Sequence, residues 1–267
     1  MQSRHNHLFA PVGGVMSQLE SLKVKIFADG ANLADMLELY KNPLIKGFTT
    51  NPTLMKKAGI TDYMEFARTV LTVIPDRPIS FEVFADDFDE MEWQAMEIAS
   101  WGGQVNVKIP VTNTRGQSSA NVVRRLAQAG VRLNVTAMTT LEQVRDIAEC
   151  LRDGPMSYVS VFAGRVADTG CDPVPIMADA VRFLSKYPQV ELIWASPREL
   201  LNIFQADAIG CHVITVTNDL LKKLPLVGRD LDEYSLDTVK MFFNDAQSAG
   251  FRLIQSKPLP VESGNQY

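Results

Sequence analysis

Short apolar runs alternate along the chain with longer segments in which apolar residues recur at helical spacing. Most runs contain β-branched residues, and consecutive runs lie roughly 20–30 residues apart, as expected for strands joined by crossover helices around a parallel sheet. The pattern predicts eight strands. They are expected at 24–28, 47–50, 79–84, 105–109, 132–136, 158–162, 191–195 and 212–216.

The segments between these runs carry a helical period. Leu141, Val144 and Leu151 fall at i, i+3 and i+10 and belong to one apolar stripe. Comparable stripes occur within 91–99 and 120–127. An amphipathic stripe of this kind is typical of a helix that packs one face on a sheet.

Eight strand–helix units that close on themselves give an α/β fold, the (β/α)8 or TIM barrel, in a single domain. An open doubly wound sheet is the alternative. Such sheets commonly carry a GxGxxG turn after the first strand, whereas this chain has Ala-Asp-Gly-Ala-Asn at 28–32. The barrel is therefore the predicted fold.

No low-complexity linker divides the chain, so we expect three simple regions. Residues 1–22 are expected to form a flexible leader, 23–255 the barrel with a C-terminal helix, and 256–267 a polar tail. The C-terminal helix itself is expected at 232–250. The leader lacks the long apolar stretch of a secretory signal peptide.

Apolar side chains cluster on this last predicted helix, among them Met241, Phe242 and Phe243. They could cover the end of the barrel or form an interface between copies of the chain. Covering the barrel is the simpler expectation, and a homo-oligomer stays open.

The composition fits one large domain that binds neither nucleic acid nor membranes. The chain has 267 residues, 46% of them hydrophobic, which is enough for a barrel-sized core. Its formal net charge of -5 argues against a general affinity for nucleic acid or acidic membrane surfaces. No apolar run approaches the ~20 residues needed to cross a bilayer.

The cysteines and histidines predict neither disulfides nor a metal site. Cys150, Cys171 and Cys211 are odd in number and show no paired spacing, which favours a reducing cytoplasm. Two of the three histidines, His5 and His7, lie in the leader, and no HExxH or CxxC motif is present. A zinc site is therefore not expected.

Lysine 108 is the most informative single residue. Active sites of (β/α)8 barrels lie at the carboxyl ends of the strands, and Lys108 lies near the end of the apolar run Val-Asn-Val-Lys-Ile-Pro. A buried lysine loses its proton more easily, and its neutral amine can attack a ketone to form an iminium. The alternative is a salt-bridged structural lysine. Asn106 is two residues away and shares its face of the strand, as Asn134 and Thr136 share theirs.

Two carboxylates at strand ends are candidates for acid–base chemistry. Asp29 ends the first run and Glu82 lies within the third. One carboxylate can take a proton from the substrate, and a second can hold the water used in iminium formation and hydrolysis. Alternatively, Asp29 is the N-cap of the first helix, a position that aspartate favours. Glu82 could equally neutralise Lys108.

A candidate phosphate site follows the seventh run. Ser196 with Glu199 three residues later forms a capping-box pattern, and the proline between them favours a helix start. Helix N-termini in this part of a barrel commonly bind phosphate. Arg198, together with Arg165 of the preceding loop, would add charge-assisted hydrogen bonds.

Several of these segments resemble the transaldolase family. The resemblance runs in order from about residue 25 to residue 214 and rests on six segments, of which Ala-Ser-Pro-Arg is the weakest. The segments are Ile-Phe-Ala-Asp29-Gly, Gly-Phe-Thr-Thr-Asn51-Pro-Thr, Val-Asn-Val-Lys108-Ile-Pro-Val-Thr, Asn134-Val-Thr136, Ser160-Val-Phe-Ala-Gly-Arg165 and Ala-Ser196-Pro-Arg198.

The resemblance implies a role for each matching residue. Lys108 would form the Schiff base, Asp29 would deprotonate the C4 hydroxyl of the donor, and Glu82 with Thr136 would hold the catalytic water. The remaining residues would bind the substrate, with no metal or organic cofactor. Asn51, Asn134 and Ser160 would orient the dihydroxyacetone unit, and Arg165, Ser196 and Arg198 would hold the phosphate.

By the same resemblance, the reaction would move a dihydroxyacetone unit from sedoheptulose 7-phosphate or fructose 6-phosphate to an aldose phosphate, as in the pentose phosphate pathway. The related fructose-6-phosphate aldolases release the unit instead and tend to have glutamine where this chain has Glu82. However, Ser-Pro-Arg here replaces a Ser-Phe-Arg pattern, which leaves the natural acceptor open.

Three other readings are weaker. A deoxyribose-phosphate type of aldolase does not match the Thr-Thr-Asn-Pro turn. A non-catalytic barrel used for binding would have no need for both Lys108 and Asp29. A metal-dependent aldolase needs more ligands than His212, the one histidine within the predicted barrel.

Overall fold

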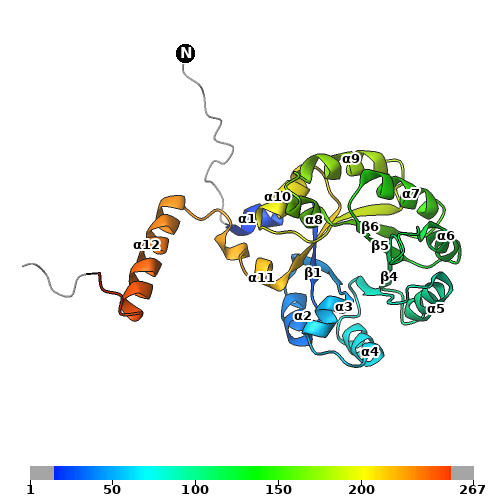
Figure 1. Cartoon of the computed structure of the whole chain (residues 1–267), viewed down its shortest axis with the longest axis horizontal. Helices are drawn as coiled ribbons and strands as arrows, with labels where there is room; N and C mark the ends of the chain where they lie inside the picture. Colours follow the sequence, from blue (N-terminus) through cyan, green and yellow to red (C-terminus); the bar gives the residue numbers. More distant parts are fainter. Residues whose placement is uncertain (1–14, 254–267) are drawn as a thin grey trace, which may run out of the picture. The chain divides into compact units, whose positions relative to one another are not determined.

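Eight parallel strands form a closed barrel in the computed structural model, which describes residues 15–253 of the chain (Figure 1). Each strand pairs with its neighbours in sequence, and β8 pairs with β1 to close the ring. The strands are β1 (Lys25–Asp29), β2 (Ile45–Thr49), β3 (Ile79–Glu82), β4 (Val105–Pro110), β5 (Leu133–Met138), β6 (Ser157–Val161), β7 (Val190–Trp194) and β8 (Val213–Thr217).

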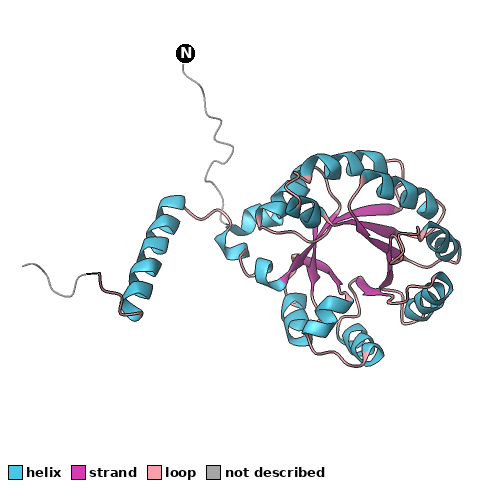
Figure 2. Cartoon of the chain, viewed as in Figure 1, coloured by secondary structure: helices cyan, strands magenta, loops and turns pink. Residues whose placement is uncertain are grey.

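Helices surround the strands, and Figure 2 shows them outside the inner ring. Together with the closed strand order, this confirms the predicted (β/α)8 barrel and excludes the open sheet. Every strand lies within two residues of its expected bounds. The helices are α2 (Leu33–Tyr40), α3 (Pro52–Lys57), α4 (Tyr63–Val73), α5 (Phe88–Ala99), α6 (Ala120–Gln128), α7 (Leu141–Leu151), α8 (Ala163–Asp168), α9 (Val174–Leu184), α10 (Leu201–Ala208) and α11 (Asn218–Leu221).

A buried apolar cluster joins side chains from four strands of the barrel. The cluster contains Phe27, Tyr158, Ile193 and Val213, and the ring centroids of Phe27 and Tyr158 lie 5.7 Å apart. A Cβ on Gly47 would lie 2.7 Å from the Phe27 ring, so the missing side chain on β2 makes room for that ring. Because side chains alternate along a strand, the residues two positions later point to the same side, nearer the carboxyl ends of the strands.

The described chain begins inside the predicted leader. There Val15–Glu20 form the short helix α1, and the flexibility of the leader stays a prediction. Leu19 in this helix is 96% buried, since only 4% of its surface is exposed. Burial of this apolar side chain stabilises the helix. Residues 1–14 lie outside the described part.

The chain divides into two compact units after Pro225. The second unit contains helix α12 (Leu231–Ser248), close to the helix expected at 232–250. Asp230 caps it by accepting hydrogen bonds from the backbone N–H groups of Asp232 and Glu233, both at 3.0 Å. No residue of α12 is buried, and Phe242 and Phe243 are each 63% exposed. The expected tail at 256–267 lies outside the described residues.

Within residues 15–253, no helix is both long and apolar enough to cross a membrane.

Candidate active site

Lys108 and Glu82 form an ion pair at the carboxyl end of the barrel. They are partners in the register of β3 and β4, and Lys108 Nζ lies 3.1 Å from Glu82 Oε2. Lys108 Nζ also donates a hydrogen bond of 2.9 Å to the backbone oxygen of Thr50. Side-chain exposure is 7% for Lys108 and 17% for Glu82. The pair is therefore largely removed from water, where a lysine amine and its carboxylate partner can exchange a proton directly.

Asp29 lies at the end of β1, and the charges of Lys108 and Glu82 both act on its carboxyl group. Thr49 Oγ1 donates a 2.7 Å hydrogen bond to Asp29 Oδ1 and also hydrogen-bonds to the hydroxyl of Thr215. Desolvation of the half-buried carboxyl raises the pKa of Asp29, while the charge of Lys108 and the bond from Thr49 oppose this. A carboxyl with a raised pKa is suited to taking up and returning protons.

The alternative role of Asp29 as a helix cap is wrong. Asn32 caps helix α2, accepting a 3.0 Å hydrogen bond from the backbone N–H of Asp35. The Asp29 carboxyl group therefore takes no part in capping α2. Thr49, which holds Asp29, was missed from the sequence; its only signal is its place at the end of β2, in register with Asp29.

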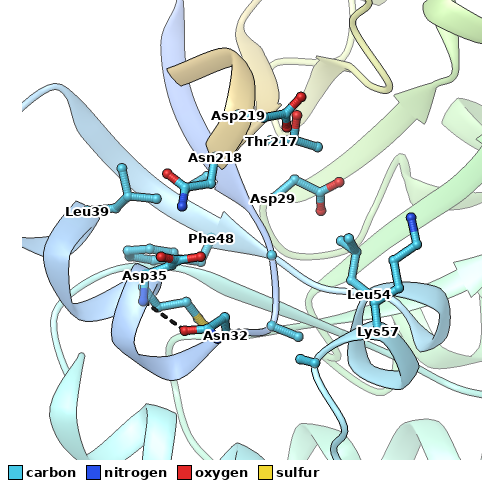
Figure 3. Close-up of a pocket in the computed structure, with 15 residues that line it drawn as sticks. Asp29, Asn32, Asp35, Leu39, Phe48, Leu54, Lys57, Thr217, Asn218 and Asp219 are labelled. Carbon is cyan, nitrogen blue, oxygen red and sulfur yellow. Dashed lines mark hydrogen bonds between the residues drawn. The ribbon is translucent and has the colours of Figure 1, made fainter. Parts of the chain in front are cut away.

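A cavity of about 330 Å³ opens beside Asp29. It is bordered by the segments that follow β1, β2 and β8, and Figure 3 shows Asp29, Asn32, Thr217 and Asp219 around it together with Lys57. Cavities of this size hold small organic molecules. The carboxyl group of Asp29 is thus within reach of a molecule that enters from this side.

Asn134 and Ser160 belong to one buried hydrogen-bonded chain. Ser160 Oγ donates to Asn134 Oδ1 at 2.7 Å, and Asn134 Nδ2 donates to Ser80 Oγ at 3.0 Å. The three side chains come from β6, β5 and β3 and are each at most 3% exposed. Ser80 was missed from the sequence, because a single serine in an apolar strand carries no distinctive signal. The network fixes the orientation of the Asn134 amide.

Thr136 points the same way as Asn134, two positions further along β5. Its Oγ1 is buried and, within the described chain, has no hydrogen-bond partner. A buried hydroxyl without a partner is costly unless water or a ligand completes it. The Thr136 hydroxyl therefore has hydrogen-bonding capacity that no side chain or backbone group of the described residues uses.

Asn51, a predicted substrate-binding residue, caps a helix in the structure. It is the N-cap of α3, and its Oδ1 accepts a 3.0 Å hydrogen bond from the backbone N–H of Leu54. The cap engages the amide oxygen, and the Nδ2 donor group takes no part in it. Asn51 follows β2 directly, at the same end of the barrel as Lys108.

The predicted helix start at Ser196 is wrong. Ser196 has a φ of 59°, in the left-handed region, whereas an N-cap residue is extended. Helix α10 begins only at Leu201. Asn202 instead organises the loop, with its Oδ1 accepting from the backbone N–H groups of Arg198 at 2.8 Å and Glu199 at 3.0 Å. Ser196 and Arg198 thus lie on an irregular loop after β7, not in the first turn of a helix.

Asp168 binds Arg198, one of the two predicted phosphate-binding arginines, and lies on the same helix as the other, Arg165. Arg198 Nε donates to Asp168 Oδ1 at 2.9 Å, and Arg198 Nη2 donates to the other carboxylate oxygen. Asp168 ends helix α8, which also carries Arg165. The hydrogen bonds from Arg198 lower the pKa of Asp168, and the charge of Arg165 acts in the same direction. Asp168 was also missed from the sequence, since one aspartate on a short helix is unremarkable.

Among the described residues, no group of three or more histidine, cysteine, aspartate or glutamate side chains is arranged to hold a metal ion.

Comparisons with known proteins identify the family of the chain. A "probable transaldolase" of Dehalococcoides mccartyi is 32% identical over 218 residues, covering 80% of this chain and 97% of that protein. Another, from Thermoanaerobacter sp., is 34% identical over 218 residues, covering 80% of this chain and 96% of that protein. A solved mandelate oxidase mutant, 14% identical with a TM-score of 0.52 over 84% of this chain and 74% of that one, shares the fold alone. The family model for transaldolase/fructose-6-phosphate aldolase matches residues 26–255, and the chain belongs to that family.

Proposed function

We propose that this protein is a transaldolase that carries a dihydroxyacetone unit on Lys108 from a ketose phosphate to an aldose phosphate. The donor is sedoheptulose 7-phosphate or fructose 6-phosphate. The observation that supports this most directly is the buried pair of Lys108 and Glu82, 3.1 Å apart, whose charges both act on Asp29.

The first half of the reaction cleaves the donor. Lys108 Nζ adds to the C2 carbonyl, and loss of one water gives the iminium, with Glu82 and Thr136 holding that water. Asp29 takes the proton of the C4 hydroxyl, the C3–C4 bond breaks, and its electron pair moves into the iminium to give an enamine. The shortened aldose leaves with a new aldehyde group.

The second half reverses these steps on another aldehyde. The enamine carbon attacks the acceptor carbonyl, and Asp29 returns its proton to the new C4 alkoxide. Water then hydrolyses the iminium and releases a ketose three carbons longer than the acceptor from Lys108. Asn51, Asn134 and Ser160 orient the three-carbon unit throughout. The buried chain through Asn134 and Ser160 supports this, because it preorganises the donors before substrate arrives.

The phosphate of each sugar is bound by Arg165, Arg198 and Ser196 at the rim. The pairing of Arg198 with Asp168 supports this, because it holds the Arg198 guanidinium against helix α8, which also carries Arg165. Arginine offers several N–H donors, so the groups that do not face Asp168 remain for a phosphate oxygen.

Release of free dihydroxyacetone, as in a fructose-6-phosphate aldolase, is the second candidate, because the family includes both activities. Glu82 favours transfer, since the related aldolases resemble this chain but tend to carry glutamine there. We place the transaldolase in the pentose phosphate pathway of the cytoplasm. The free thiols of Cys150, Cys171 and Cys211 support a reducing compartment.

Borohydride reduction in the presence of fructose 6-phosphate tests the proposal. We expect an adduct of dihydroxyacetone size on Lys108, found by intact-mass analysis and peptide mapping. Lys108→Met should form no adduct and lose C–C cleavage by about a thousandfold or more, with an unchanged far-UV circular dichroism spectrum. Cleavage near the wild-type rate in Lys108→Met would contradict a Schiff base at this residue.

A further inference from the structure

The backbone of Glu82 extends beyond the strand that should pair with it. The last register partners of β2 and β3 are Thr49 and Ser80, and the last hydrogen bond runs from Thr50 N to Ser80 O at 3.2 Å. The chain then turns away, because Asn51 begins helix α3. In a strand the N–H and C=O groups of residues two apart point to the same side, so those of Glu82 face the position that β2 has left.

The hydroxyl of Tyr63 occupies that position. Tyr63 Oη accepts a 2.8 Å hydrogen bond from the backbone N–H of Glu82 and donates one of 2.7 Å to the backbone oxygen of the same residue. A phenol can donate and accept at once, so one atom supplies both partners that a strand would have offered. Tyr63 is the first residue of α4, and the N-cap Asp62 fixes the first turn of this helix by accepting a 2.9 Å hydrogen bond from the backbone N–H of Glu65.

Packing holds the Tyr63 ring in place. Its centroid lies 5.6 Å from that of Phe84, 5.9 Å from that of Trp101 and 6.3 Å from that of Phe81. Burial raises the pKa of Tyr63. The hydroxyl therefore keeps its proton, and with it the donor that the Glu82 carbonyl needs, throughout the physiological pH range.

We propose that Tyr63 is a positioning residue of the active site, whose hydroxyl replaces the missing strand at Glu82 and so keeps the Glu82 carboxylate next to Lys108. This role rests on the proposed function. The side chain of Glu82 leaves a backbone that is held on one side by β4, through the hydrogen bond from Val83 N to Lys108 O, and on the other by Tyr63. Without the hydroxyl, only the β4 side remains.

The test is Tyr63→Phe, which removes the hydroxyl and keeps the ring. We expect kcat to fall by about fivefold to tenfold, because both hydrogen bonds between the hydroxyl and the Glu82 backbone are lost, with the KM for fructose 6-phosphate within about twofold. The ratio of transfer to free dihydroxyacetone release should also fall. Tyr40→Phe is the matched control. Among residues 15–253 its hydroxyl bonds only to the exposed Asp76, at 2.7 Å, and all these values should stay at wild type.

A double-mutant cycle separates positioning from mere packing. If Tyr63 acts through Glu82, then Tyr63→Phe should change kcat by less than about twofold when added to Glu82→Gln. Losses that multiply would overturn the proposal. Hydrogen exchange at the Glu82 amide gives a readout without catalysis and should be at least about tenfold faster in Tyr63→Phe; unchanged exchange would also overturn it.

These outcomes are distinct from failure of the proposed function. If wild-type protein forms no borohydride adduct on Lys108, the function fails and the role of Tyr63 falls with it. If the adduct forms and Tyr63→Phe behaves like Tyr40→Phe, only the role of Tyr63 is wrong.

Discussion

The backbone oxygen of Ser196 lies 1.6 Å from the position that a Cβ on Gly164 would take. The loop after β7 therefore rests directly on the first turn of α8, and the same Cβ position is 3.3 Å from Arg198 Nε. Only glycine permits this approach. It brings the loop with Ser196 and Arg198 against the helix that carries Arg165 and Asp168.

Gly164→Ala should displace this loop and impair phosphate binding. The new methyl group would overlap the Ser196 carbonyl, and relief of such overpacking costs about 1–3 kcal/mol. We expect a lower melting temperature and a higher KM for fructose 6-phosphate. Gly103→Ala is the control, because no atom lies within 4 Å of its Cβ position. Equal behaviour of the two variants would show that the loop is not held by this contact.

Arg198→Ala should weaken the binding of phosphorylated sugars selectively. Loss of charge-assisted hydrogen bonds of about 1.5–3 kcal/mol raises the KM by about ten- to a hundredfold. The KM for free dihydroxyacetone, which has no phosphate, should change little. Arg182→Ala removes a surface arginine that pairs with Asp179 and serves as the control. Equal effects of Arg198→Ala on both substrates would remove Arg198 from the phosphate site.

Glu82→Gln should shift the reaction from transfer towards release. Glutamine keeps the size of Glu82 but loses the charge that faces Lys108 Nζ at 3.1 Å and the ability to accept a proton. We expect more free dihydroxyacetone per transferred unit, measured by assaying both products in one reaction with erythrose 4-phosphate as acceptor. An unchanged product ratio would count against a role for Glu82 with the catalytic water.

Asp29→Asn should stabilise the fold at neutral pH while removing cleavage. Because desolvation raises the pKa of Asp29 above the ordinary value of an aspartate, the folded state holds this proton more tightly than the unfolded chain does. Ionisation of Asp29 therefore lowers stability as the pH rises through its folded pKa, and the penalty is absent below the unfolded pKa. The gain in melting temperature should be largest at pH 7 and shrink as the pH falls towards 4. A variant less stable than wild type at pH 7 would contradict this.

Local sequence patterns were sufficient to predict the (β/α)8 fold. Apolar runs separated by amphipathic segments identified all eight strands, because period and β-branching are properties of neighbouring residues. Gly47 shows the limit of this reading. Nothing in its own segment reveals that it makes room for the ring of Phe27, twenty residues earlier, since that contact exists only after the barrel closes.

The site was predicted in part for the same reason. Lys108 stood out because a charged residue within an apolar strand is unusual, and its partner Glu82 because it too interrupts a strand. Tyr63, Ser80 and Asp168 gave no such signal, since each is ordinary in its own segment. The capping-box prediction at Ser196 failed because a tertiary contact with Gly164 overrode the local preference for a helix start.

The sequence by itself determined the barrel, the strand ends and which polar side chains interrupt them. Only the tertiary structure decided which of those side chains meet: that Glu82 faces Lys108, that Thr49 holds Asp29, and that Asp168 holds Arg198. Hydrophobic periodicity depends on neighbouring residues and can therefore be read directly from the sequence. Hydrogen bonds and ion pairs depend on distances of about 3 Å between residues far apart in the chain, and closure of the barrel sets those distances.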